Sequence, residues 1–271
     1  MFESLKVDLH IHSNLSDGEL SPNQIFEISQ KRGLNVISIT DHDCIDGSIL
    51  INSSDKLKVI IGAEMSTIYK DNNVHVLGYF NNREDAIEFN KIIKNLQINR
   101  IERAKNVIEL LKVKKNIEID INNLMFSKSI NRKNIADEII KKYPFMKKKE
   151  VFKLISKGGE CYIPSSKIPT AKMVEYLHNH NALAIIAHPV LVKDFEIAEF
   201  IAMGIDGLEA IYPQNTKKDT IRLLSLCKDN NLLITGGSDF HDFEDQKHGI
   251  IGDFFVFGNQ IKEFLEKIGV K

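Results

Sequence analysis

Short apolar runs alternate along the chain with longer stretches in which apolar residues recur at helical spacing. The short runs predict strands at residues 5–11, 36–40, 58–61, 75–80, 182–187, 207–210 and 232–235. The helical spacing predicts helices at residues 21–32, 170–179, 197–203, 216–230 and 260–268. This alternation of strands and helices favours an α/β fold built on a parallel sheet.

The strand pattern largely disappears between about residues 83 and 158. Apolar positions from 86 to 111 fall mainly on one face of a helix, and shorter helices are predicted at 135–140 and 149–156. We therefore expect a helical insertion, residues 83–159, within an α/β barrel domain formed by residues 1–82 and 160–271. A chain of 271 residues can hold both, because such barrels run to about 250 residues.

The composition is that of an ordinary globular protein and excludes several classes. Apolar residues make up 43% and charged residues 27%, which excludes a wholly disordered chain or a coiled coil. The longest apolar run, 182–187, is far shorter than the ~20 residues that span a membrane. The N-terminal segment lacks a signal-peptide pattern, and the three cysteines form no CxxC motif. We expect a cytoplasmic protein without membrane association.

The net charge of −1 conceals an uneven distribution. Residues 91–157 hold 18 Lys and Arg against 7 Asp and Glu, a net charge of +11, and the rest of the chain has a net charge of −12. The basic segment is either a helical segment with a solvent-exposed, lysine-rich face or an insertion that faces an anionic substrate. Long duplex DNA is not an expected partner, because the acidic remainder would repel a polyphosphate backbone.

Histidines and carboxylates gather at or just beyond the predicted strands. His10 and His12 are two positions apart on the first strand and therefore point to one face. Seven more candidates accompany them: Asp17, His42, Glu64, His75, His188, Asp239 and His241. In a parallel barrel the carboxyl ends of all strands meet at one face, where metal ions bind imidazole and carboxylate together. Nine ligands suit two or three divalent ions of Mn, Fe or Zn, and catalysis by the same residues through metal-activated water.

Seven short motifs resemble, in order, those of the PHP superfamily, the polymerase and histidinol phosphatase group of metal-dependent phosphoesterases. They are DLHIHS (8–13), SDG (16–18), TDHD (40–43), GAE (62–64), HVLGY (75–79), AHP (187–189) and GSDFH (237–241). The resemblance covers nearly the whole chain and implies a distorted (β/α)7 barrel with up to three metals.

The resemblance also implies how the ligands are divided among the metals. The first metal would be bound by His10, His12, Glu64 and Asp239, and the second by Asp17, His42 and His241. The third would be bound by His75 and His188, with Glu64 as a bridge. All nine positions match, so an active enzyme is expected.

Motifs at 100–104, 131–136, 152–158 and 207–213 resemble one branch of the superfamily. That branch removes the 3′-phosphate of 3′,5′-nucleotide bisphosphates and also trims short RNA from 5′ to 3′. Where it usually has His beside its phosphate-binding Arg, this chain has Asn134, which implies either weaker binding or a different substrate. The candidate substrate-binding residues are Arg132, Lys133, Asn134, Arg100, Arg103 and Lys157.

The leading hypothesis is thus a phosphatase acting on a small nucleotide or a short RNA end, as a monomer or small homo-oligomer. The alternatives are a histidinol-phosphate phosphatase and a non-catalytic, metal-binding accessory domain. Asp8, Asp41 and Asp43 are expected to orient ligating imidazoles. His248, in a loop after the last motif, is a candidate to line the pocket.

Overall fold

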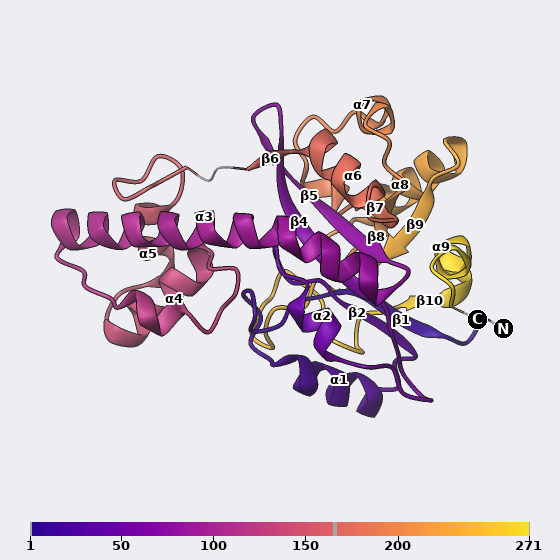
Figure 1. Ribbon diagram of the computed structural model, residues 1–271, viewed down its shortest axis with the longest axis horizontal. Coiled ribbons are helices and arrows are strands. Elements are labelled where there is room, and N and C mark those ends of the chain that lie inside the picture. The colour runs from indigo at the N-terminus through magenta and orange to yellow at the C-terminus, as the bar shows by residue number, and fades with distance from the viewer. Residues whose placement is uncertain (1, 165–166, 271) are drawn as a thin grey trace.

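The computed structural model describes residues 2–164 and 167–270 and shows an α/β body beside a helical lobe (Figure 1). Two sheets form the body, with strand orders β10-β1-β2-β3 and β6-β4-β5-β7-β8-β9. The strands are β1 (Lys6–Ile11), β2 (Val36–Ile39), β3 (Lys58–Val59), β4 (Ile61–Tyr69), β5 (Asn72–Phe80), β6 (Ile168–Pro169), β7 (Ala182–Ile186), β8 (Gly207–Ile211), β9 (Leu233–Gly236) and β10 (Val256–Phe257).

The helices cover the outside of the body and make up most of the lobe. They are α1 (Pro22–Lys31), α2 (Asp46–Leu50), α3 (Arg83–Lys115), α4 (Arg132–Lys142), α5 (Lys148–Ile155), α6 (Thr170–His178), α7 (Ile197–Ala202), α8 (Lys217–Asp229) and α9 (Lys262–Lys267). Short 3-10 helices lie at Ile121–Leu124, Pro189–Leu191 and Gly258–Ile261. None of the helices within the described ranges is long and apolar enough to cross a membrane.

Two isolated bridges join the sheets into a ring. Ile11 at the end of β1 pairs with Phe240 beyond β9, and His42 beyond β2 pairs with Glu64 of β4. The ring therefore runs β1-β2-β4-β5-β7-β8-β9, a seven-stranded barrel distorted where only single bridges close it. The predicted fold class, an α/β barrel with a helical insertion, is confirmed.

Strand β5 departs from the expected parallel arrangement, because it pairs antiparallel with both β4 and β7. Tyr69 pairs with Asn72, so a two-residue turn connects β4 to β5, and Lys70 in that turn has a positive φ of 51°. The start of β5 consequently lies at the same end of the ring as the carboxyl ends of the parallel strands. This reversal brings His75, near the start of β5, to the face that carries the other candidate ligands.

The prediction of one strand at 58–61 was wrong in detail. That segment holds β3 and the first residue of β4, and β4 continues to Tyr69. Glu64 therefore lies within a strand rather than after one. The apolar pattern misses most of β4 because Glu64, Ser66 and Thr67 interrupt it, although all three side chains are buried. Helix α2 and the short strands β6 and β10 were not predicted either.

Helix α3 belongs to both parts of the molecule. Its first half buries Phe89 and Ile93 in the core of the barrel, and its second half buries Val107 and Leu111 in the separate core of the lobe. Asn82 caps the start of α3, with its side chain accepting from the N–H of Asp85. One continuous helix thus connects the lobe to the body (Figure 1). The boundaries proposed for the insertion, residues 83 and 159, remain a prediction.

Candidate metal and phosphate site

The nine candidate metal ligands form one cluster at the carboxyl end of the parallel strands. Their ligand atoms fall into overlapping groups in which all atoms lie within 4.8 Å of one another. One group is His10, His12, Glu64 and Asp239, another is His12, Asp17, His42 and His241, and a third is His42, Glu64 and His75. His188 belongs to none of these groups, but it borders the third, since its Nε2 lies 2.9 Å from Glu64 Oε1.

Glu64 lies at the centre of the cluster and is 1% exposed. Its Oε1 lies 2.8 Å from His75 Nδ1 and 2.9 Å from His188 Nε2. Its Oε2 lies 2.9 Å from His42 Nδ1. The two oxygens therefore face different imidazoles, the arrangement that a carboxylate bridging two metals would need.

The cluster also contains buried polar atoms that lack a hydrogen-bond partner. They include His12 Nδ1, Asp17 Oδ1 and His188 Nδ1. Leaving such atoms unsatisfied costs about 1–3 kcal/mol each, more for charged groups. Divalent cations fit this set, because imidazole nitrogens and carboxylate oxygens converge at short range without cysteine.

The carboxylates of the cluster are held in their ionised form. Burial alone would raise the pKa of Glu64, but the nearby imidazoles of His42 and His75 lower it well below its usual range. Burial likewise opposes a charge on His12, yet hydrogen bonds to Asp239 and Glu64 raise its pKa to about 10. For His75, burial prevails and lowers the pKa to about 4. Ionised carboxylates are the form that metal binding requires.

Glu209 on β8 holds two of the candidate ligands in place. Its Oε1 accepts from His10 Nδ1 at 2.9 Å, and its Oε2 accepts from the backbone N–H of His188 at 2.8 Å. The first contact turns His10 Nε2 toward the cluster. No role for Glu209 was predicted from the sequence, although a carboxylate within an apolar strand could have marked it as a functional residue.

The expectation for the three neighbouring aspartates was wrong. Asp8 accepts from the backbone N–H groups of His10 and Ser238, and Asp41 accepts from the backbone and hydroxyl of Ser13. Asp43 accepts from the backbone N–H of Ser66 and pairs with Arg100. Within the described residues no hydrogen bond joins these carboxylates to an imidazole ring. They instead hold the backbone and hydroxyl groups of the segments that carry the candidate ligands.

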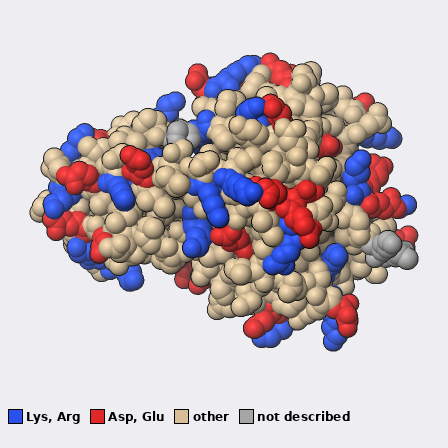
Figure 2. Space-filling model, viewed as in Figure 1, with Lys and Arg blue, Asp and Glu red and all other residues tan. Residues whose placement is uncertain are grey.

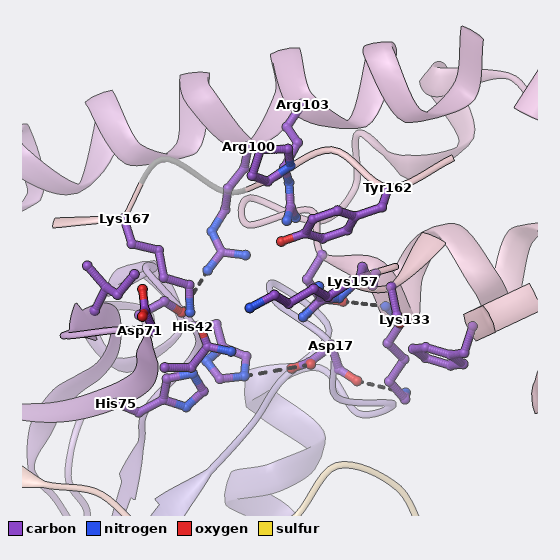
Figure 3. A pocket seen from close by; sticks show the side chains of 18 residues that line it. Asp17, His42, Asp71, His75, Arg100, Arg103, Lys133, Lys157, Tyr162 and Lys167 are labelled. Atoms are coloured by element: carbon purple, nitrogen blue, oxygen red, sulfur yellow. Dashed lines mark hydrogen bonds and ion pairs between the residues drawn. The ribbon is translucent and has the colours of Figure 1, made fainter. Parts of the chain in front are cut away.

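A cavity of about 630 Å³ opens onto the cluster (Figure 3). Asp17, His42 and His75 form one side of it. Basic residues line it as well: Arg100, Arg103, Arg132, Lys133, Lys157 and Lys167. In Figure 3, Arg100 and Arg103 reach down from α3 toward the imidazoles. The cavity thus joins candidate metal ligands to a group of cations.

Most of these cations have no carboxylate partner. Arg100 is paired with Asp43, but the structure gives Arg103, Arg132, Lys157 and Lys167 no carboxylate within 4.0 Å among the residues described. Burial, with neighbouring arginines, lowers the pKa of Arg103 to about 10 and that of Lys167 to about 8. The cavity therefore has an excess of positive charge that a bound anion would neutralise.

Five of the basic residues of 91–157 line this cavity, namely Arg100, Arg103, Arg132, Lys133 and Lys157. Figure 2 shows Lys and Arg side chains interspersed with Asp and Glu on the visible face of the helical lobe. The concentration of cations that matters for a ligand is thus inside the cavity. Lys167 was not predicted from the sequence, since no motif around it indicates a phosphate-binding residue.

Lys133 and Asn134, both predicted to contact the substrate, instead form hydrogen bonds with the loop that carries Asp17. The ammonium of Lys133 donates to the backbone carbonyl of Asp17 at 2.8 Å. The side chain of Asn134 lies outside the cavity, where its Oδ1 accepts from the N–H of Asn131 and its Nδ2 donates to the carbonyl of Ser16. Both residues therefore connect α4 to the loop that carries Asp17.

His248 lies at the edge of the cluster, beside Asp239. Its Nε2 is 3.4 Å from Asp239 Oδ2, and its Nδ1 is 2.7 Å from Asp245 Oδ2. It lines a second cavity of about 1180 Å³, which shares Asp17, Lys133 and Phe152 with the first. The candidate metal site is thus open on two sides.

Comparison with known proteins agrees with this geometry. The PHP domain model matches residues 8–157, more than half of the chain. The chain belongs to the PHP domain family. It is 28% identical over 253 residues to a 5′-3′ exoribonuclease of Haemophilus influenzae, covering 87% of this chain and 90% of that protein. It is 24% identical over 250 residues to a 3′,5′-nucleoside bisphosphate phosphatase of Chromobacterium violaceum, covering 87% of each.

The fold of this PHP protein also matches a solved structure. A candidate metal-dependent phosphoesterase of Bifidobacterium adolescentis superposes with a TM-score of 0.80 at 24% identity, over 97% of this chain and 96% of that one. This likeness supports the fold. The family match and the relatives identify the protein as a phosphoesterase of the PHP family.

Replacing Glu64 by Gln should remove both metal and activity. An amide carries no negative charge and offers a single oxygen, so it is a poor bridge between two cations. We expect Glu64→Gln to lose at least one metal equivalent in elemental analysis. Its turnover should fall by more than the roughly 10–100-fold typical of losing an outer partner of a metal ligand. Glu199→Gln, the same change on α7, is the control. Full metal content with near-normal turnover would contradict a bridging role.

Proposed function

We propose that this PHP protein removes the 3′-phosphate of 3′,5′-nucleotide bisphosphates, with two or three Mn, Fe or Zn ions in the histidine–carboxylate cluster. One observation carries the proposal: a single cavity has the cluster on one side and unpaired cations on the other. A substrate with two separated phosphates matches both. The name of the Chromobacterium violaceum relative supports the same substrate class.

The roles of the residues follow from their places around the cavity. Bound metals would supply Lewis acidity toward the scissile phosphate and lower the pKa of the attacking water. Arg103, Arg132 and Lys167 would hold the second phosphate, which fixes the position of the scissile one. The rings of Phe152 and Tyr162 also line the cavity and offer flat faces to a nucleobase.

The second cavity favours an additional activity on short RNA. In a 3′-phosphate and in an RNA linkage the same P–O3′ bond is broken, and RNA has a further nucleotide beyond the phosphorus. The cavity of about 1180 Å³, which Asp17 also lines, has room for that nucleotide. Asp242, Glu244 and Asp245 line it, so it disfavours a long polyanionic strand.

Histidinol phosphate is the less suitable substrate. It carries an ammonium group close to its phosphate, and that group would enter a cavity already rich in cations. The unpaired Arg103 and Arg132 therefore count against it.

Release of inorganic phosphate from candidate substrates tests the proposed function. With added Mn²⁺, the protein should hydrolyse 3′-phosphoadenosine 5′-phosphate far faster than histidinol phosphate, and chelation should abolish the activity. Short 5′-phosphorylated RNA should be a slower substrate. A preference for histidinol phosphate, or activity that survives chelation, would overturn the proposal.

Replacing Arg132 by Ala should separate binding from chemistry. If Arg132 holds the second phosphate, its loss should cost about 2–5 kcal/mol, or roughly 30-fold to several thousandfold in kcat/KM for the bisphosphate. Hydrolysis of p-nitrophenyl phosphate should barely change, because it has no second phosphate. Arg222→Ala on α8 is the matched control. Equal loss on both substrates would place Arg132 at the scissile phosphate or in the support of the fold.

Lys167 should make the reaction sensitive to alkaline pH. Its pKa is lowered to about 8, so the ammonium is present below pH 8 and is lost as the pH rises through that value. The kcat/KM for the bisphosphate, which reports the free enzyme, should therefore fall above about pH 8. In Lys167→Arg this step should disappear, because a guanidinium stays protonated. The same step in both proteins would assign it to another group.

A further inference from the structure

The helical lobe and helix α3 contact the three loops that carry Asp17, His42 and His241, which form one ligand group together with His12. Each contact falls on a ligand residue or within two residues of one. Sequence patterns could not reveal this, because the lobe residues lie far along the chain from the loops that they touch.

The loop of Asp17 has the most contacts. Lys133 Nζ donates to the carbonyl of Asp17 at 2.8 Å, and Asn134 Nδ2 donates to the carbonyl of Ser16 at 2.9 Å. The hydroxyl of Ser127 donates to the same Ser16 carbonyl at 2.9 Å. The backbone N–H of Lys128 donates to the carbonyl of residue 15 at 2.8 Å.

The other two loops are held by one residue of the lobe and by two residues of α3. The ammonium of Lys133 also lies 3.5 Å from the carboxylate of Asp242, which follows His241 directly. On the far side, Arg100 pairs with Asp43, the residue after His42, and is 11% exposed. Gln97 of α3 adds a hydrogen bond to the carbonyl of Asp43 at 3.1 Å.

The remaining ligands are supported differently. His10 lies on β1, His12 follows directly after that strand, and Glu64 lies on β4. In the described parts of the chain, hydrogen bonds and ion pairs to these side chains come from barrel residues, Glu209 among them. The loops of Asp17, His42 and His241 therefore depend on contacts from α3 and the lobe, whereas His10, His12 and Glu64 are supported by the barrel.

We propose that the helical lobe sets the metal affinity of the Asp17–His42–His241 site through the positioning residues Lys133, Asn134 and Arg100. The site binds its ion tightly only while α4 and α3 hold the three loops. The same lobe carries Arg103 and Arg132, so a nucleotide bound between lobe and barrel strengthens metal binding. By linkage the metal strengthens nucleotide binding by the same factor. This inference rests on the proposed function for the identity of the nucleotide.

The amide at position 134 agrees with this role. Asn134 accepts a hydrogen bond at the start of α4 and donates one to the Ser16 carbonyl in the Asp17 loop, and a single amide group supplies both. The residue thus supports the loop rather than a phosphate.

Calorimetric titration of metal-stripped protein with Mn²⁺ tests the proposal. Wild type should bind at least two equivalents. Lys133→Met should weaken one of them by about 10–100-fold and leave the rest unchanged. Asn134→Ala should weaken the same equivalent. Lys141→Met, an exposed lysine of the same helix, should change none. In wild type, adenosine 5′-phosphate should raise the Mn²⁺ affinity of the same equivalent. In Lys133→Met this effect should be absent.

Two results would overturn the inference. One is unchanged Mn²⁺ affinity in both Lys133→Met and Asn134→Ala, and the other is equal weakening of all equivalents in a variant whose thermal unfolding is unchanged. Either result could occur while wild type still hydrolyses the bisphosphate with bound metal, so the proposed function would stand. Wild type that binds no Mn²⁺ or releases no phosphate would instead refute the proposed function.

Discussion

The burial of the Glu64 carboxylate among imidazoles is the constraint around which the site is built. A charge with 1% exposure is stable only if its neighbours compensate it, and five histidines lie within 3.4 Å of its two oxygens. Those histidines come from several strands, so the barrel must bring the strand ends together for the cluster to form. Lone pairs that remain unpaired, such as Asp17 Oδ1, are the reason that the cluster fits metal ions.

The backbone bends sharply where it delivers these side chains. Asp43, His188 and Asp239 have positive φ values of 43°, 30° and 52°, a region that L-residues rarely adopt. Strain of this kind persists only where surrounding contacts over-determine it, and at these three residues it lies at or beside the candidate ligands. The reversal of β5 has the same effect by topology, since it brings His75 to the ligand face. The fold is therefore irregular at the end of the barrel where the candidate ligands lie.

Helix α3 connects the two functions of the cavity. Its first half is part of the barrel core, and its second half is part of the lobe, so Arg100 and Arg103 lie above the ligands on a rigid element. The lobe in turn holds the Asp17 loop through the hydrogen bond from Lys133 to the Asp17 carbonyl. Cations that would bind a substrate phosphate and contacts that support a metal ligand thus belong to one structural unit. A ligand that draws the lobe onto the barrel would stabilise both.

The sequence by itself determined the family, the fold class and the identity of the nine candidate ligands, because ordered motifs and strand periodicity are local properties. It also located the basic segment of 91–157. What the polar residues of the lobe contact became visible only in the folded structure: Arg132 lines the cavity, Lys133 and Asn134 hold a loop, and Lys167 lines the cavity from outside the segment. The same holds for Glu209 and the reversal of β5. These depend on contacts between residues far apart in the chain, and no local pattern encodes them.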